Sequence, residues 1–185
     1  MGRPCRSSQL WPGASPKGTV LNINSARADT RDVAEILVVD DDPDIRALIR
    51  LTLETYGYVV REAGDGMQAL DALSEHEPDA MVLDVMMPKM DGYGVLRTMR
   101  QREMAPHTKV LMLTCKTEER DFVRGWELGA DDYRTKPFEP MELAENLENL
   151  LRTSAETLHN RRQAELEKAE LLDRLESAFS RPVGR

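Results

Sequence analysis

Apolar and polar positions along the middle of the chain separate short strands from amphipathic helices. Short apolar runs recur there, each bounded by polar or turn-forming residues, as is typical of strands buried in a sheet. These runs predict four strands, and a weaker run predicts a fifth. The expected strands are Ile36–Val39, Tyr58–Val60, Ala80–Leu83, Val110–Leu113 and Asp132–Arg134.

Between these runs, apolar residues recur three or four positions apart, the spacing of one face of an α-helix. Asp42 and Pro43 form a helix start, with a capping residue before a proline, and Gly57 marks a helix end. Five strands that alternate with five helices predict an α/β fold, a doubly wound parallel sheet with helices on both faces. The apolar helix positions are Ile45, Leu48, Ile49, Leu53 and Tyr56; Ala69, Leu70 and Leu73; Val95, Leu96 and Met99; Phe122, Val123 and Trp126; and Leu143, Leu147 and Leu150.

The two ends of the chain differ from this central domain, which we place at residues 34–153. Residues 1–33 are rich in Ser, Pro, Gly, Asn and Arg without apolar periodicity, and they predict a disordered tail. Residues 154–180 consist of helix formers, so we expect them to continue the last helix of the domain as one long helix. A short tail follows at residues 181–185.

The helical extension carries a weak seven-residue repeat. Leu151, Leu158, Leu172 and Phe179 fall on one row, but Glu165 interrupts it. The row favours a coiled coil, whereas the interruption favours a single solvated helix. Both interpretations remain open, and the first would make the protein a homodimer.

Composition argues against several classes of protein. The 185-residue chain has no apolar run long enough for a transmembrane helix and no apolar segment near its start that would predict a signal peptide. Its net charge of −8 and the lack of a recognisable nucleic-acid module argue against direct binding to nucleic acid. Two distant cysteines, Cys5 and Cys115, predict neither a disulfide nor a zinc site. We therefore expect a cytoplasmic protein without membrane insertion.

Charged and polar residues stand at the ends of four predicted strands. Asp40 and Asp41 follow the first strand, Asp84 the third and Thr114 the fourth, and Lys136 comes after the fifth. In an open parallel sheet, ligands bind beyond the carboxyl ends of the strands. Carboxylates that converge there repel one another, and a bound cation would offset that repulsion. Because Mg²⁺ prefers oxygen ligands, the cluster predicts a Mg²⁺ site.

Four motifs at these strand ends carry a resemblance to a known family. They are VVDDD at residues 38–42, VLDVMMPKMDG at 82–92, MLTC at 112–115 and GADDYRTKPF at 129–138. In this order and spacing they resemble the receiver domain of two-component response regulators, over about residues 34–153. The resemblance implies a flavodoxin-like sheet with the strand order 2-1-3-4-5.

The resemblance also implies roles for individual residues. Asp84 would be the phosphoacceptor, a carboxylate nucleophile that forms an acyl phosphate. Asp40 and Asp41 would hold Mg²⁺ together with Asp84 and the backbone carbonyl of Met86. Lys136 would contact the phosphoryl oxygens. The remaining implied roles are Thr114 as the switch hydroxyl, Tyr133 as the switch aromatic and Pro137 as the proline of a cis peptide.

A receiver implies an upstream partner, either a sensor histidine kinase or a phosphotransfer protein, and a downstream protein that the sequence leaves unknown. The winged-helix branch of the family pairs its receivers through charged residues at positions where this chain has Phe122, Met141 and Asn146. We therefore do not expect that charged dimer. Phe122, Trp126 and Met141 could instead form a more apolar face for a different partner.

The favoured function is a phosphoacceptor response regulator that signals through protein–protein contacts and is no enzyme beyond self-phosphorylation and autodephosphorylation. One alternative is a Mg²⁺-dependent phosphotransferase or phosphatase that acts on a separate substrate. Haloacid-dehalogenase enzymes need a second Asp two residues after the nucleophile, where this chain has Met86. The other alternative is a structural coiled-coil protein with a degenerate receiver, against which the intact site argues.

Overall fold

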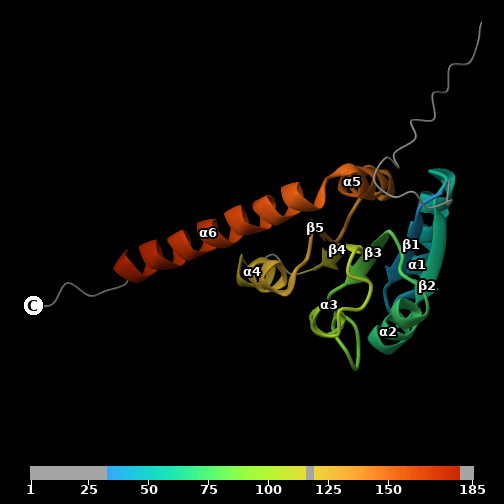
Figure 1. The fold of residues 1–185 in the computed structure, drawn as a ribbon, viewed down its shortest axis with the longest axis horizontal. Helices are drawn as coiled ribbons and strands as arrows, with labels where there is room; N and C mark the ends of the chain where they lie inside the picture. Colours follow the sequence, from blue (N-terminus) through green and yellow to red (C-terminus); the bar gives the residue numbers. More distant parts are fainter. Residues whose placement is uncertain (1–32, 116–118, 180–185) are drawn as a thin grey trace, which may run out of the picture. The chain divides into compact units, whose positions relative to one another are not determined.

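The computed structural model describes residues 33–115 and 119–179, so the predicted tails at residues 1–33, apart from Val33, and 181–185 lie outside the described residues. Strands and helices alternate from β1 to α5, and a further helix, α6, follows (Figure 1). Among the described residues, no helix is both long enough and apolar enough to cross a membrane. The elements are β1 (Glu35–Val39), α1 (Pro43–Thr55), β2 (Val59–Ala63), α2 (Gly66–Glu75), β3 (Ala80–Asp84), α3 (Gly92–Gln101), β4 (Lys109–Thr114), α4 (Glu119–Leu128), β5 (Asp132–Thr135), α5 (Pro140–Arg152) and α6 (Ala155–Phe179).

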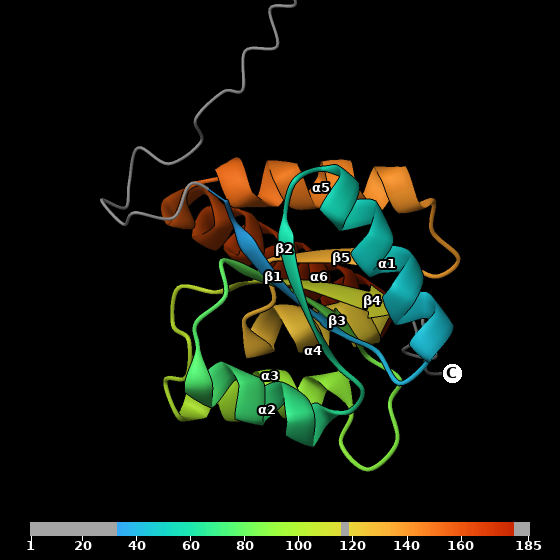
Figure 2. The same cartoon turned by 90° about the vertical axis from the view of Figure 1, so that its right-hand side faces the viewer.

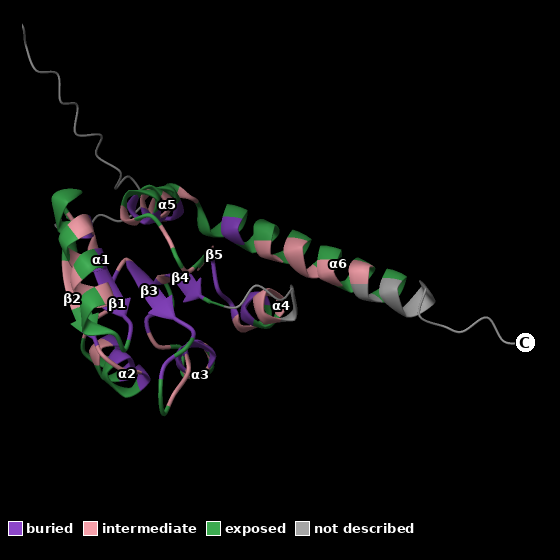
Figure 3. Ribbon diagram, turned by 180° about the vertical axis from the view of Figure 1, so that it is seen from behind, coloured by how far each residue is buried: buried purple, intermediate pink, exposed green. Residues whose placement is uncertain are grey.

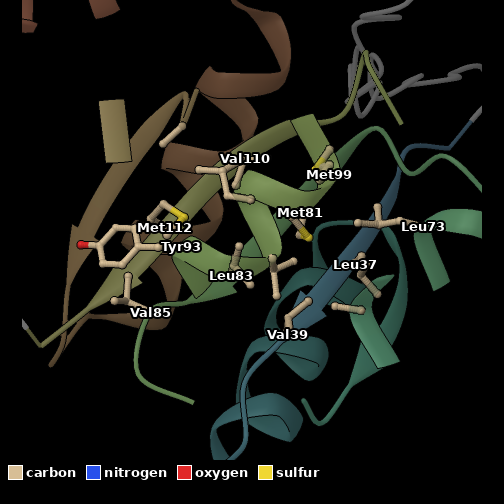
Figure 4. Packing of buried hydrophobic residues seen from close by; sticks show 14 of the residues in the cluster. Leu37, Val39, Leu73, Met81, Leu83, Val85, Tyr93, Met99, Val110 and Met112 are labelled. Atoms are coloured by element: carbon tan, nitrogen blue, oxygen red, sulfur yellow. The ribbon is translucent and has the colours of Figure 1, made fainter. Parts of the chain in front are cut away.

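The five strands form one parallel sheet in the order β2-β1-β3-β4-β5, which confirms the predicted fold class. β3 lies at the centre, and its five residues are all buried (Figure 3). Residues of α1 and α5 pack on one face of the sheet, and residues of α2, α3 and α4 pack on the other (Figure 2). On the second face, Leu37, Met81 and Met112 of three neighbouring strands share a cluster with Tyr93 and Met99 of α3 (Figure 4).

β2 differs from the strand that the apolar pattern predicted at Tyr58–Val60. It begins at Val59 and ends at Ala63, because parallel pairing with β1 continues through Arg61 and Glu62. β2 is an edge strand, so these charged side chains can pair with charged side chains at the surface. Oε2 of Glu62 lies 3.0 Å from Nε of Arg50. An apolar run marks only part of such a strand, since charged positions on an edge need not be buried.

The expectation of one long helix from Pro140 to Phe179 is wrong, because the chain leaves the helical conformation at Thr153. Thr153 has extended backbone angles, with φ −74° and ψ 133°. The Ser154 hydroxyl then accepts a hydrogen bond from the amide of Thr157 at 3.2 Å, as a helix-capping residue does. The ammonium of Lys109 donates to the carbonyls of Leu150, Leu151 and Thr153 at 3.0, 2.7 and 2.7 Å. These bonds satisfy carbonyls that a continuous helix would have used itself.

After this break, α6 contacts α4. Leu158 is buried in the core cluster of the α1–α5 face, and Leu166 packs against the cluster of the opposite face. Part of the predicted seven-residue row is thus already used within the chain. The homodimer, which would use the same row, stays a prediction.

Candidate functional site

The carboxyl ends of the central strands bring together the residues that the sequence placed there. Asp40 follows β1, Asp84 ends β3 and Thr114 ends β4, and all three side chains are almost fully buried. Lys136 follows β5, whose last residue pairs with Thr114 in the sheet. The site therefore depends on the strand order, since β1, β3, β4 and β5 are neighbours.

Lys136 ties two of the buried carboxylates together. Its Nζ donates to Oδ2 of Asp40 at 2.6 Å and lies 3.1 Å from Oδ1 of Asp84. Burial alone would lower the pKa of Lys136, but the hydrogen bond to Asp40 and the charge of Asp84 outweigh it and raise that pKa above its usual value. Lys136 is therefore a fixed cation within reach of both acids.

Asp84 is a buried carboxylate whose charge its surroundings only partly satisfy. Burial raises the pKa of Asp84, and the charge of Asp40 raises it further, whereas Lys136 and a hydrogen bond from the Met86 amide lower it. Its Oδ1 accepts no aligned hydrogen bond from the described residues, so the contact with Lys136 is an ion pair only. Such an oxygen gains from a further cation or donor.

The three carboxylates fit a divalent cation with oxygen ligands. One ligand atom from each of Asp40, Asp41 and Asp84 lies within 4.8 Å of the others. Asp41 is exposed, whereas Asp40 and Asp84 are buried, so a cation held here would face solvent on one side. Mg²⁺ keeps several waters and takes few carboxylates, which matches this half-open arrangement. Asp42 does not belong to the group, since its side chain caps α1 by accepting from the amides of Asp44 and Ile45, as predicted.

Tyr133 lies on the α4 side of the sheet. Its ring packs edge-on against Phe122 and Trp126 of α4, with centroids 5.3 and 5.0 Å away. Burial raises the pKa of Tyr133, and its hydroxyl has no hydrogen-bond partner among the described residues. Trp126 is thus buried and Phe122 is half-buried, so they do not form the exposed apolar face with Met141 that the sequence suggested, and only Met141 of the three is well exposed.

Two glycines and an arginine shape the site and were missed in the sequence. A Cβ on Gly92 would lie 2.3 Å from the carbonyl oxygen of Asp84, and a Cβ on Gly125 would lie 1.1 Å from the Tyr133 hydroxyl. Arg46 donates to the Asp40 carbonyl at 2.6 Å and so fixes the end of β1. The sequence shows Gly92 only as a turn residue after Asp91, because the close approach depends on distant segments. The peptide between Lys136 and Pro137 is cis, as predicted.

Comparisons with known proteins identify the family. The family described as the response regulator receiver domain matches residues 36–148, and the chain belongs to it. The sequence is 48% identical over 120 residues to the alkaline phosphatase synthesis transcriptional regulatory protein PhoP of Bacillus subtilis, covering 65% of this chain and 49% of that protein. It is 41% identical over 117 residues to the DNA-binding dual master transcriptional regulator RpaA of Synechocystis, covering 63% of this chain and 48% of RpaA.

A solved structure shows the same fold. The chemotaxis response regulator CheY4 of Vibrio cholerae is 34% identical, with a TM-score of 0.61 over 64% of this chain and 98% of CheY4. The chain spans about half the length of the curated relatives that it matches. What those longer proteins do through their other half is therefore not shown for this chain, and the expectation that it does not bind nucleic acid stays a prediction.

Because burial disfavours the ionised form of Asp84, we predict that Asp84→Asn raises the free energy of unfolding of the metal-free protein near neutral pH. Because the folded pKa of Asp84 lies above its usual value, the folded state holds this proton more tightly than the unfolded state. The free energy of unfolding therefore falls as pH rises from the usual carboxyl pKa of about 4 through the folded pKa, because the buried carboxyl becomes ionised over this range. Asparagine removes the charge, so we expect a gain of about 1 kcal/mol, or about 3 °C in the melting temperature.

Thermal unfolding of wild type and Asp84→Asn, with and without Mg²⁺, measures this effect. The exposed Asp71→Asn on α2 is the control and should leave the melting temperature unchanged. Added Mg²⁺ should stabilise wild type more than Asp84→Asn. A melting temperature of Asp84→Asn at or below that of wild type in metal-free buffer would contradict the prediction.

Proposed function

We propose that the protein is the phosphoacceptor of a two-component system or phosphorelay, that it is phosphorylated on Asp84 with Mg²⁺ bound, and that it signals through protein–protein contacts. The observation that carries the proposal is the buried Asp84 carboxylate, which lies 3.1 Å from the ammonium of Lys136 and has an oxygen within 4.8 Å of carboxylate oxygens of Asp40 and Asp41. Membership in the receiver family supports the same assignment.

The chain's own residues supply the chemistry of the transfer. A lone pair of the Asp84 carboxylate attacks the phosphorus of the donor, the bond from phosphorus to the donor breaks, and its electron pair leaves with the donor. Phosphoryl transfer depends mainly on positioning and on neutralising charge, and Lys136, whose Nζ lies 3.1 Å from Oδ1 of Asp84, would neutralise charge on the phosphoryl oxygens. Asp40 and Asp41, with Asp84 and the carbonyl of Met86, would hold Mg²⁺, which would neutralise further phosphoryl charge. Thr114 and Tyr133 would respond to the modification as switch residues.

The proposal includes partners on both sides of the modification. A sensor histidine kinase or phosphotransfer protein would donate the phosphoryl group, and a downstream protein would recognise the modified form. The names of the relatives, which are transcriptional regulators, support a role in signal transduction. In this role the chain catalyses only its own phosphorylation and dephosphorylation, in the cytoplasm.

Incubation with acetyl phosphate and Mg²⁺ tests the proposal directly. Intact-mass measurement should show one added phosphoryl group that is absent without Mg²⁺ and is released by hydroxylamine, as an acyl phosphate is. Fragmentation after borohydride reduction should place the modification on Asp84. A modification that resists hydroxylamine and survives acid would assign the chemistry to a serine or threonine and overturn the proposal.

Metal binding should depend on Asp41, the exposed member of the acidic group. Even residues that only orient metal ligands typically change affinity by about 10- to 100-fold, so we expect Asp41→Asn to weaken Mg²⁺ binding at least about tenfold. Calorimetric titration measures this, with Asp42→Asn as the control, because asparagine caps a helix as well as aspartate does. Equal Mg²⁺ affinities in Asp41→Asn and Asp42→Asn would remove Asp41 from the proposed site.

A further inference from the structure

The α4–β5 face, defined here as α4, residues 129–131 and the first residue of β5, is covered by α6. Arg162 of α6 is the main polar anchor. Its Nη2 lies 2.7 Å from Oδ1 of Asp131, and its Nε donates to the carbonyl of Ala130 at 3.0 Å. A second arginine, Arg161, lies 3.3 Å from the carboxylate of Asp132. The pair of Arg162 with Asp131 is largely shielded, with side chains 23% and 8% exposed, so salt screens it less than an ordinary surface pair. The Arg161 side chain is 50% exposed, so its pair with Asp132 is the weaker contact.

Apolar contacts lie one helical turn to either side of Arg162. Leu158 is 4% exposed and packs in the cluster of the α1–α5 face, beside the edge of the α4–β5 face, whereas Leu166 packs against the cluster that contains Trp126 and Tyr133. Leu158, Arg162 and Leu166 therefore form one stripe, four residues apart, that faces the body of the domain. The outer residues Leu171 and Leu175 are exposed and take no part in it. Docking by this stripe is specific, because the apolar contacts and the ion pair of Arg162 with Asp131 must fit together.

The four-residue strand β5 connects this docked helix to the carboxylate site. Its first residue, Asp132, contacts Arg161 of α6, and the residue after its end, Lys136, contacts Asp40 and Asp84. Between them, Tyr133 packs against α4, the helix on which α6 lies. A movement of Lys136 toward a new anion would therefore be transmitted along only four residues to the surface that holds α6.

We propose that α6 is a latch on the α4–β5 face, and that a phosphoryl group on Asp84 weakens its docking and opens this face to a partner helix. The partner helix would carry the stripe of α6, an arginine with an apolar residue four positions to either side. The direction of the coupling follows from the contacts: Arg161 fits Asp132, and Leu166 fits the cluster that contains Tyr133, so a shift of β5 and Tyr133 weakens that fit. The release step rests on the proposed function, whereas the docking does not.

Loss of the Arg162 anchor tests the docking. In a Trp11→Phe background, Trp126 is the only tryptophan, and it lies in the cluster that Leu166 covers. Arg162→Ala should shift its emission to longer wavelength and speed amide exchange in α6 at least several-fold. The control is Arg174→Ala, whose side chain is 75% exposed and pairs only with Glu170 of the same helix among the described residues. Identical spectra and exchange for both variants would overturn the docking.

Beryllofluoride, which mimics a phosphoryl group on an aspartate, tests the release. With Mg²⁺ it should speed exchange in α6 of the wild type about fivefold or more, the usual lower range of coupling between two sites. Coupling is reciprocal, so Arg162→Ala should bind beryllofluoride more tightly, while Arg174→Ala should not. Binding of beryllofluoride with unchanged exchange in α6 would overturn the latch alone. Failure of the wild type to bind it would overturn the proposed function together with the release step.

A peptide of residues 155–175 serves as the probe for the opened face. It should bind the full-length protein in the presence of beryllofluoride and Mg²⁺ and bind more weakly without them, since α6 then occupies the face. The same peptide with Ala in place of Arg162 is the control and should bind several-fold more weakly in both conditions. Equal binding of both peptides would overturn the assigned partner chemistry.

Discussion

Asp84→Asn should abolish Mg²⁺-dependent phosphorylation by acetyl phosphate. An amide has no carboxylate lone pair that can attack phosphorus, and it cannot form an acyl phosphate without first being hydrolysed. Asparagine has nearly the same shape, so the variant should fold normally and even melt at a higher temperature. Loss of a nucleophile typically lowers a rate by a thousandfold or more, so we expect incorporation to fall by at least about 1000-fold.

Asp91→Asn is the matched control for this loss. Asp91 lies in the same segment after β3, but its carboxylate caps α3 by accepting from the Gly94 amide at 2.7 Å. Asparagine can make the same bond, so this variant should incorporate the phosphoryl group at nearly the wild-type rate. Label retained by Asp84→Asn at the level of Asp91→Asn would show that another residue is the acceptor.

The strands and the site residues at their ends were predictable because apolar runs and the residues that bound them are local features of the sequence. An apolar run marks a buried strand such as β3, and the residue at its end, Asp84, must lie at the carboxyl edge of the sheet. Once the strand order follows from the resemblance, Asp40, Thr114 and Lys136 must lie near Asp84, as the structure shows. The role of the Met86 carbonyl as a metal ligand stays a prediction.

The course of α6 could not be predicted in the same way. The contacts that stop α5 come from Lys109, on a strand far away in the sequence, and those that hold α6 come from Asp131 and Asp132. The only local signal for the break is Ser154, a capping residue type directly before Ala155. Helix propensity favours continuation through Thr153, and tertiary contacts overrule it.

Gly92→Ala is the second change for which we expect a large effect, although Gly92 contributes no side chain to the site. Its Cα lies close to the backbone of Asp84, and an added Cβ would come within 2.3 Å of the Asp84 carbonyl oxygen and 3.0 Å of Cα of Val85. The Gly92 amide also donates to the carbonyl of Val85 at 3.0 Å, which holds the two segments together. Backbone atoms cannot move aside as a flexible side chain does, so the variant must displace Asp84 itself.

Two measurements follow for Gly92→Ala. Urea unfolding should show a loss of about 3 kcal/mol, the upper range for added atoms in a packed interior. Beryllofluoride binding should weaken about 100-fold, because a displacement of about 1 Å in a reacting group has effects of that size. Gly64→Ala is the control, since its Cβ would meet only side-chain atoms at 3.5 Å or more, and it should change stability by less than about 1 kcal/mol. If the two variants unfold at the same urea concentration and bind beryllofluoride equally, the contact beneath Asp84 does not position the acceptor.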